Sequence, residues 1–329
     1  MDQVAFIVGE TFIYWNSIIL LIAAATAVFT FLAFYLRREG NGISAALFIP
    51  LATVLSILLA RLIHWYCRAD AYQDLASAMT DFSGGGYALM GVFFGCALAA
   101  LVLRAARIIL DLAHTFDCLA LAAGAGISIG RLACLFTTGD RGMLIEGITS
   151  LPLVYPVNNA VTGVAEYRLA TFMLQAIVTG VIFLVLTCFY LFKKRERKLR
   201  DGDTAMLFLS AYCAFQAVLD STRYDSLFFR SNGFVSVVQI LCALALVAVL
   251  VIFSMRMVQT TGFRWWHALM WGGCAALLGG AGFMEYWVQR HSHQALFSYS
   301  VMSICLVGVV VMTCVIRSLA VPKNRNNNK

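Results

Sequence analysis

The chain has 329 residues, of which 61% are hydrophobic and only 12% charged, and its formal net charge is +7. A soluble globular domain carries about 45–50% apolar and about 25% charged residues. The balance therefore excludes a disordered chain, a nucleic-acid-binding domain and an ordinary cytosolic enzyme. It predicts an all-α protein with several transmembrane helices, with no nucleic acid among its partners.

Apolar runs of about 17–25 residues, the length that a helix needs to cross a bilayer, follow one another along the chain. They predict about nine spans. In chain order these are Ile13–Tyr35, Ala45–Tyr66, Gly86–Leu103, Phe116–Phe136, Ala170–Phe192, Thr204–Ser221, Phe234–Met255, Trp265–Tyr286 and Phe297–Ile316.

The basic residues predict how these spans are oriented. Most of the 24 Lys and Arg residues follow the first, third, fifth, seventh and ninth spans, with a dense run at Lys193–Arg200. Cytoplasmic segments carry the excess of positive charge in membrane proteins. We therefore expect the N-terminus outside and the C-terminus in the cytoplasm, with Lys193–Arg200 as an orientation anchor at anionic lipid or, less simply, a partner site.

The cysteines and histidines predict no cofactor. None of the 10 cysteines forms a C-x-x-C pair, and nearly all lie inside apolar runs, where a thiol acts as a small apolar side chain. His291 and His293 are two apart with no carboxylate or cysteine pattern beside them, which is a weak metal signal. We expect no metal.

Ionisable groups inside spans are costly, so they mark candidate functional sites. Arg61, Arg131 and the group Gln216, Asp220 and Arg223 all fall near the predicted outer ends of their spans. The loops on the predicted outer side contain further charged residues that we expect to lie over these span ends, namely Asp140, Arg141, Glu146 and Arg168. One interpretation is a cationic pocket for a lipid phosphate, because guanidinium donates two parallel hydrogen bonds to phosphate. The other is that these arginines reach headgroups or form structural ion pairs.

Five segments resemble, in order, the motifs of the bacterial prolipoprotein diacylglyceryl transferases. In Asp117–Phe136 an Asp precedes Gly130-Arg131 by thirteen residues, similar to the stretch before the family's Gly-Arg-x-Gly-Asn-Phe. The other segments are Ala60–Leu62, Gly85–Gly91, Tyr212–Asp225 and Ser236–Ile240. The resemblance implies a seven-helix core over residues 1–257, followed by two additional helices and a basic tail over residues 258–329.

The resemblance also implies a reaction and a place. Family members of the bacterial plasma membrane move a diacylglyceryl group from phosphatidylglycerol to the cysteine thiol of a prolipoprotein lipobox. The family's phosphate-handling arginines fall on Arg131 and Arg223, and its glutamate on Asp220. The expected catalytic residues are therefore Arg131, Arg223 and Asp220. The expected substrate-binding residues are Arg61, Gly86, Met90, Gly91, Gly130, Cys134, Gln216 and Asp225.

Several positions depart from the family pattern. Met90 occupies the position of a family histidine or tyrosine, Cys134 that of the signature asparagine, and Gln216 that of an arginine. Two functions therefore stay open: an active transferase, or a non-catalytic or altered-substrate relative that binds phospholipid or a membrane partner. A transporter is less favoured, because no pair of interrupted helices recurs in the two halves.

Overall fold

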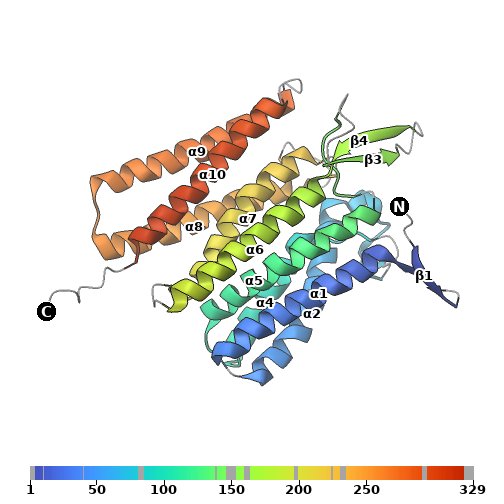
Figure 1. Ribbon diagram of the computed structural model, residues 1–329, viewed down its shortest axis with the longest axis horizontal. Helices are drawn as coiled ribbons and strands as arrows, with labels where there is room; N and C mark the ends of the chain where they lie inside the picture. Colours follow the sequence, from blue (N-terminus) through green and yellow to red (C-terminus); the bar gives the residue numbers. More distant parts are fainter. Residues whose placement is uncertain are drawn as a thin grey trace.

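A computed structural model describes residues 4–9, 11–39, 41–80, 85–137, 139–145, 153–158, 164–195, 199–223, 225–229, 235–290 and 295–321. Within these ranges the chain is largely helical (Figure 1). The α-helices are α1 (Trp15–Glu39), α2 (Gly42–Cys67), α3 (Leu75–Thr80), α4 (Leu89–Ala105), α5 (Leu112–Gly130), α6 (Thr171–Arg195), α7 (Asp203–Thr222), α8 (Val237–Thr261), α9 (Trp265–Arg290) and α10 (Ala295–Leu319).

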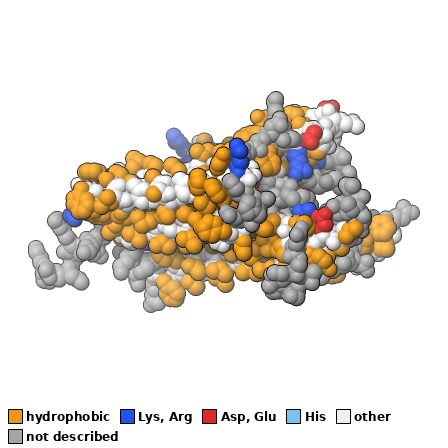
Figure 2. Space-filling view, turned by 90° about the horizontal axis from the view of Figure 1, so that it is seen from above, with side chains coloured by type: hydrophobic (Ala, Val, Ile, Leu, Met, Phe, Trp, Pro, Cys, Tyr) orange, Lys and Arg blue, Asp and Glu red, His pale blue; other side chains and the backbone are white. Residues whose placement is uncertain are grey.

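The predicted polytopic helix bundle is confirmed. In the described part of the chain, 8 helices are long and apolar enough to cross a membrane, and α4 is a shorter apolar helix. Together they coincide with the nine predicted spans. Hydrophobic side chains cover most of the face seen in Figure 2, and the acidic side chains visible there gather at one end of the molecule.

The helix ends differ from the predicted span boundaries at several places, and three of them bear on the hairpin end. The first span was expected from Ile13, but that residue lies in a strand and α1 begins at Trp15. The third was expected from Gly86, but Gly85 and Gly86 have positive φ angles and α4 begins at Leu89. The fourth reaches Phe136 as predicted, but it is α-helical only to Gly130 and continues as a 3₁₀-helix over Arg131–Phe136.

Two β-hairpins that the hydropathy pattern does not reveal lie at one end of the bundle (Figure 1). Strands β1 (Val4–Val8) and β2 (Thr11–Tyr14) pair antiparallel before α1. Strands β3 (Val154–Asn158) and β4 (Ala165–Leu169) pair antiparallel before α6, with Tyr155 opposite Arg168. We call this the hairpin end. The opposite end, where α6, α8 and α10 finish and α7 begins, is called the basic end.

Helix α5 lies between two hydrophobic cores. One core contains Phe31 and Tyr35 of α1 with residues of α2 and α4, and the other contains buried residues of α6, α7, α8, α9 and α10. Helix α5 contributes Cys118 to the first and Leu121 to the second. Because α5 ends at the hairpin end and packs on both sides, the residues that follow it are held at the centre of the bundle.

Helices α9 and α10 form an antiparallel pair beside α7 and α8 (Figure 1). The inner member, α10, packs on α7 and α8, and its Tyr299 hydroxyl donates to the carbonyl of Ser221 at 3.1 Å. These helices correspond to the predicted additional segment. The basic tail after residue 321, Glu146, and the middle of the Lys193–Arg200 run lie outside the described residues.

Candidate active site

Two arginines from distant parts of the sequence meet on one carboxylate at the hairpin end. Arg131, the first residue of the 3₁₀-helix after α5, donates from Nη1 to Oδ2 of Asp140 at 2.5 Å. Arg223, which caps the end of α7, pairs through Nη2 with the other oxygen of Asp140. We call these three residues the Asp140 cluster. All three side chains are largely buried, with exposed fractions of 14–16%.

A second aspartate supports the cluster. Asp225 accepts from Nε of Arg223 at 3.0 Å and, through its other oxygen, from the backbone N–H of Asp140 at 2.9 Å. The backbone of Asp140 has φ of 56°, a left-handed conformation uncommon for a residue other than glycine. Thr171, at the start of α6, holds it by donating to the Asp140 carbonyl at 2.5 Å. Residues kept in such conformations gather at functional sites.

The cluster keeps Asp140 ionised. Burial by itself would raise the pKa of Asp140, but the guanidinium groups of Arg131 and Arg223 outweigh it and lower the pKa to about 2. Burial opposes the charge on Arg223 too, yet Asp140 and Asp225 raise the pKa of that guanidinium. Both arginines and the carboxylate therefore carry full charges at neutral pH.

Two neighbours enclose Asp140. The thiol of Cys134 donates to Asp140 Oδ2 at 3.2 Å. Arg141 is buried, donates to the carbonyls of Cys134 and Thr137, and stacks its guanidinium over Tyr155 of β3 and Phe172 of α6 at 4.2 and 4.5 Å. An arginine next to Asp140 in a short polar loop was the sequence signal for this residue.

Asp220 lies on the last turn of α7 behind the cluster. Its carboxylate accepts from the Ser236 hydroxyl, and its nearer oxygen is 4.0 Å from Nη1 of Arg223. Ser236 caps α8 in a capping box with Gln239, which explains the Ser236–Ile240 motif as a helix start. Asp220 therefore joins the ends of α7 and α8 at the edge of the cluster.

Gln216 belongs to a neighbouring polar chain. Its side-chain oxygen accepts from Gln175 of α6 at 2.5 Å, and the same Gln175 amide donates to the Tyr212 hydroxyl at 3.0 Å. All of these side chains are buried. These hydrogen bonds join α6 to α7 about two to three turns before Arg223.

The structure places Arg61 against the loop before α4. Its guanidinium donates to the carbonyls of Gly85 and Gly86 and lies over the rings of Tyr72 and Tyr87. Gly86 has φ of 81°, and a Cβ there would lie 2.2 Å from the Tyr72 hydroxyl. Glycine is thus required by this packing. Arg68, which caps the end of α2 about two turns after Arg61, donates to the Asp225 carbonyl at 3.2 Å and links this region to the cluster.

Three other expected site residues lie at helix contacts. A Cβ on Gly91 would come 2.2 Å from the backbone of Ala60, so Gly91 lets α4 approach α2. Gly130 faces Ala23 of α1, and Met90 packs against the larger core. Asp117, the first residue of the signature stretch, lies at the basic end and accepts from the N–H groups of Gly202 and Ala205.

Fold and site together define a polytopic membrane protein with a buried arginine–carboxylate cluster at one membrane end. A family model described as prolipoprotein diacylglyceryl transferase matches residues 3–255, and the chain belongs to that family. The phosphatidylglycerol–prolipoprotein diacylglyceryl transferase of Streptococcus sanguinis (strain SK36) is 26% identical over 235 residues, covering 70% of this chain and 87% of that protein.

Two further relatives carry the same name. The protein of Streptococcus equi subsp. zooepidemicus (strain H70) is 23% identical over 250 residues, covering 75% of this chain and 94% of its own length. That of Streptococcus pneumoniae (strain Hungary19A-6) is 25% identical over 246 residues, with 73% and 90% covered. The resemblance inferred from the motifs is therefore confirmed. The family match ends at residue 255, and α9 and α10 follow it.

Proposed function

We propose that this protein transfers the diacylglyceryl group of phosphatidylglycerol to the cysteine thiol of a prolipoprotein. The hairpin end then faces the outer side of a bacterial plasma membrane, because the opposite end carries the excess of basic residues. Family membership supports the reaction. The observation that carries the assignment of the site is the meeting of Arg131 and Arg223 on Asp140.

The two arginines stabilise the leaving group of the reaction, which is the phosphate of the lipid. In the reaction the thiol releases its proton to solvent and the thiolate sulfur attacks the glyceryl carbon bonded to phosphate. A C–S bond forms, the C–O bond breaks, and glycerol phosphate leaves with the electron pair. Negative charge grows on the phosphate as it departs, and preorganised guanidinium donors stabilise it. Because Asp140 holds one nitrogen of each guanidinium, both groups are oriented before the lipid arrives, and their other N–H donors bind the phosphate.

Asp140 is assigned a positioning role. A carboxylate whose pKa is about 2 is a poor acceptor for the proton of a thiol with an ordinary pKa of about 8.5. The two guanidiniums act instead on the substrate thiol, since nearby positive charge favours the thiolate. Cys134 keeps its proton in the hydrogen bond to Asp140, so it helps to position that carboxylate and is not the nucleophile.

The roles of the other expected site residues are assigned from their positions around the Asp140 cluster. Asp225 and Asp220 hold Arg223 from its other sides. Gly86 and Arg61 shape the loop before α4, and Gln216 joins α7 to α6 through Gln175. Gly91 and Gly130 allow close helix contacts with Ala60 and Ala23, and Met90 packs against the larger core.

A lipid-binding relative without turnover is the second candidate. The observation that favours it is Met90, which takes the position of a family histidine or tyrosine, packs against the core and cannot accept a proton. Such a protein would use the Asp140 cluster to hold a phospholipid phosphate and would form no thioether.

The two candidates are separated by a direct assay. The purified full chain is mixed with phosphatidylglycerol and a lipobox peptide, and the thioether product is measured by mass spectrometry. The proposal expects product with the wild type and none with Arg131→Ala. Arg290→Ala is the matched control, because Arg290 is exposed at the same membrane end. Lipid co-purification without product in the wild type would support the second candidate.

A further inference from the structure

Arg141, the residue after Asp140, is a buried arginine that folds back onto the segment carrying Arg131. The residue is 1% exposed. Its Nη2 donates to the carbonyl of Cys134 at 2.9 Å and to that of Thr137 at 2.7 Å. Both carbonyls lie at the end of the 3₁₀-helix that begins with Arg131. The side chain of Arg141 therefore fastens the end of this helix to the loop that contains Asp140.

Two aromatic rings fix the Arg141 guanidinium in this place. Its Cζ lies 4.2 Å from the ring centre of Tyr155, on β3, and 4.5 Å from that of Phe172, on α6. The Tyr155 hydroxyl also donates to the carbonyl of Leu135 at 3.2 Å. Carbonyls at the end of a helix lack partners within the helix, and here Arg141 and Tyr155 supply them. The β3–β4 hairpin and α6 thus hold the 3₁₀-helix through one arginine and one tyrosine.

These contacts surround a residue in an unfavourable backbone conformation. Asp140 has φ of 56°, and a left-handed residue other than glycine persists only where the surrounding structure holds it. Before it in the chain, Cys134 belongs to the fastened 3₁₀-helix, and its thiol donates to the Asp140 carboxylate. After it, Arg141 is anchored between the two rings. The carboxylate that joins Arg131 to Arg223 is therefore placed by the residues anchored on both sides of it.

We propose that Arg141 is a positioning residue for diacylglyceryl transfer, an inference that rests on the proposed function. Its guanidinium holds the loop so that Asp140 keeps Arg131 and Arg223 oriented toward the lipid phosphate. Arg141 acts through Asp140 and not by contact with the phosphate, because rings and carbonyls enclose its side chain. The planar guanidinium suits this place, whereas the compact, strongly hydrated ammonium of a lysine does not stack between rings in the same way.

Arg141→Lys tests the proposal, because it keeps the charge and removes the planar group. We expect thioether formation from phosphatidylglycerol and a lipobox peptide to fall about tenfold, through poorer orientation of the cluster. Arg168→Lys is the matched control, because Arg168 lies on β4 opposite Tyr155 and forms its own ion pair with Glu166. We expect a rate near that of the wild type for the control. Equal loss in both variants would overturn the specific role of Arg141.

The double variant Arg141→Lys/Asp140→Asn separates positioning from a merely structural contribution. If Arg141 acts through the Asp140 carboxylate, its substitution changes the rate by less than about twofold once that carboxylate is absent. Rates are expressed per folded molecule, with the melting temperature measured for each variant. Losses that multiply in the double variant would show that the two residues act independently, and the proposal would be wrong.

Tyr155→Phe keeps the proposal testable if Arg141→Lys does not fold. This substitution removes the hydrogen bond to Leu135 and retains the ring beside Arg141. We expect the rate to fall about threefold, the effect of one neutral hydrogen bond, and to change little in the Asp140→Asn background. An unchanged rate for Tyr155→Phe alone would contradict the proposal.

Failure of the proposed function would be seen separately, in the wild type. If the wild type forms no thioether, the transferase assignment is wrong, and the same set of variants is compared for retention of phosphatidylglycerol by native mass spectrometry. Weaker retention in Arg141→Lys that disappears in the Asp140→Asn background would still support positioning of the arginines by Arg141. Retention unchanged by Arg141→Lys would overturn it.

Discussion

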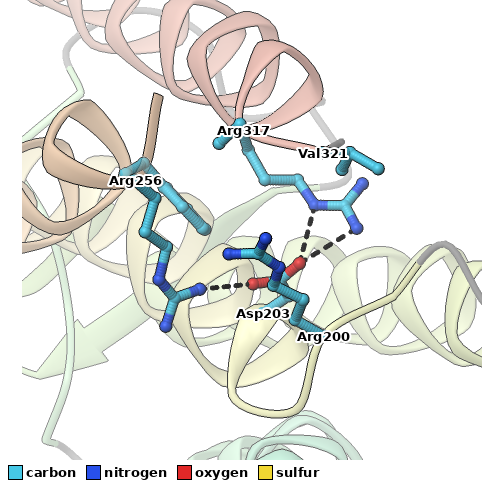
Figure 3. Close-up of a pocket in the computed structure, with 7 residues that line it drawn as sticks. Arg200, Asp203, Arg256, Arg317 and Val321 are labelled. Carbon is cyan, nitrogen blue, oxygen red and sulfur yellow. Dashed lines mark hydrogen bonds and ion pairs between the residues drawn. The ribbon is translucent and has the colours of Figure 1, made fainter. Parts of the chain in front are cut away.

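The two ends of α7 hold the same arrangement, an aspartate between two arginines, built in different ways. At the basic end Asp203 belongs to the helix itself, its side chain is 3% exposed, and its partners are Arg256 of α8 and Arg317 of α10 (Figure 3). At the hairpin end Asp140 lies in a loop with a left-handed backbone, and its side chain is 16% exposed. The first arrangement joins three helices, whereas the second orients two guanidiniums around a partly buried loop residue.

The surroundings of the two aspartates differ as well. Asp225 and Asp220 add negative charge around Arg223, while Arg200 adds positive charge beside Asp203. The hairpin end therefore orients its arginines through several carboxylates and is suited to charge that changes during a reaction. At the basic end the ion pairs of Asp203 instead join α7 to α8 and α10.

Removing an arginine at the hairpin end should have the largest effect. We expect Arg131→Ala and Arg223→Ala each to lower diacylglyceryl transfer by about 10²–10³-fold, because each removes a donor to the leaving phosphate. The rate of thioether formation with a lipobox peptide measures this. Insertion and melting temperature in detergent are checked in parallel, and near-normal rates in a folded variant would refute the assigned role.

Asp140→Asn should have a smaller effect on the same reaction. Both arginines remain, but they lose their common anchor, so we expect transfer to fall by about 10–100-fold through poorer orientation. Asp140→Glu should restore part of the rate, because it keeps the charge. A purely structural role would instead lower the amount of folded protein and leave the rate per folded molecule unchanged.

At the basic end, substitution should affect stability more than chemistry. Arg317→Gln removes one of the two ion pairs of buried Asp203, and we expect unfolding to become easier by about 2–3 kcal/mol. Hydrogen exchange should rise first in α10, since that helix loses its attachment to α7. Uniform exchange across the bundle would show that the pair does not fasten α10.

Lowering the pH should reduce the free energy of unfolding by a still smaller amount, through Asp140 at the hairpin end. The pKa of Asp140 is about 2 in the folded protein, below the value of about 3.9 expected when unfolded. A lowered pKa stabilises the fold above about pH 4, and the contribution, of order 2 kcal/mol, is lost as pH falls toward 2. Melting curves should therefore show a larger loss between pH 5 and 3 for the wild type than for Asp140→Asn.

The sequence motifs predicted which residues belong to the site better than they predicted the contacts that these residues make. Arg131 and Arg223 were expected together and do meet, but Asp140 was expected in the covering loop or as a base, not as the residue that joins the two arginines. Arg61 was expected in the same cationic pocket, whereas its guanidinium donates to the Gly85 and Gly86 carbonyls. Spacing along a span predicts the depth of a residue in the membrane and not the direction in which its side chain points.

The sequence by itself determined the helix bundle, the approximate spans and the family, because each apolar run must cross the bilayer and the motifs keep their order. The tertiary structure alone decided that Asp140 joins Arg131 to Arg223, that Asp117 accepts from the N–H groups at the start of α7, and that Asp203 joins Arg256 and Arg317. These contacts link residues far apart in the chain, and only the packing of the helices brings them within hydrogen-bonding distance.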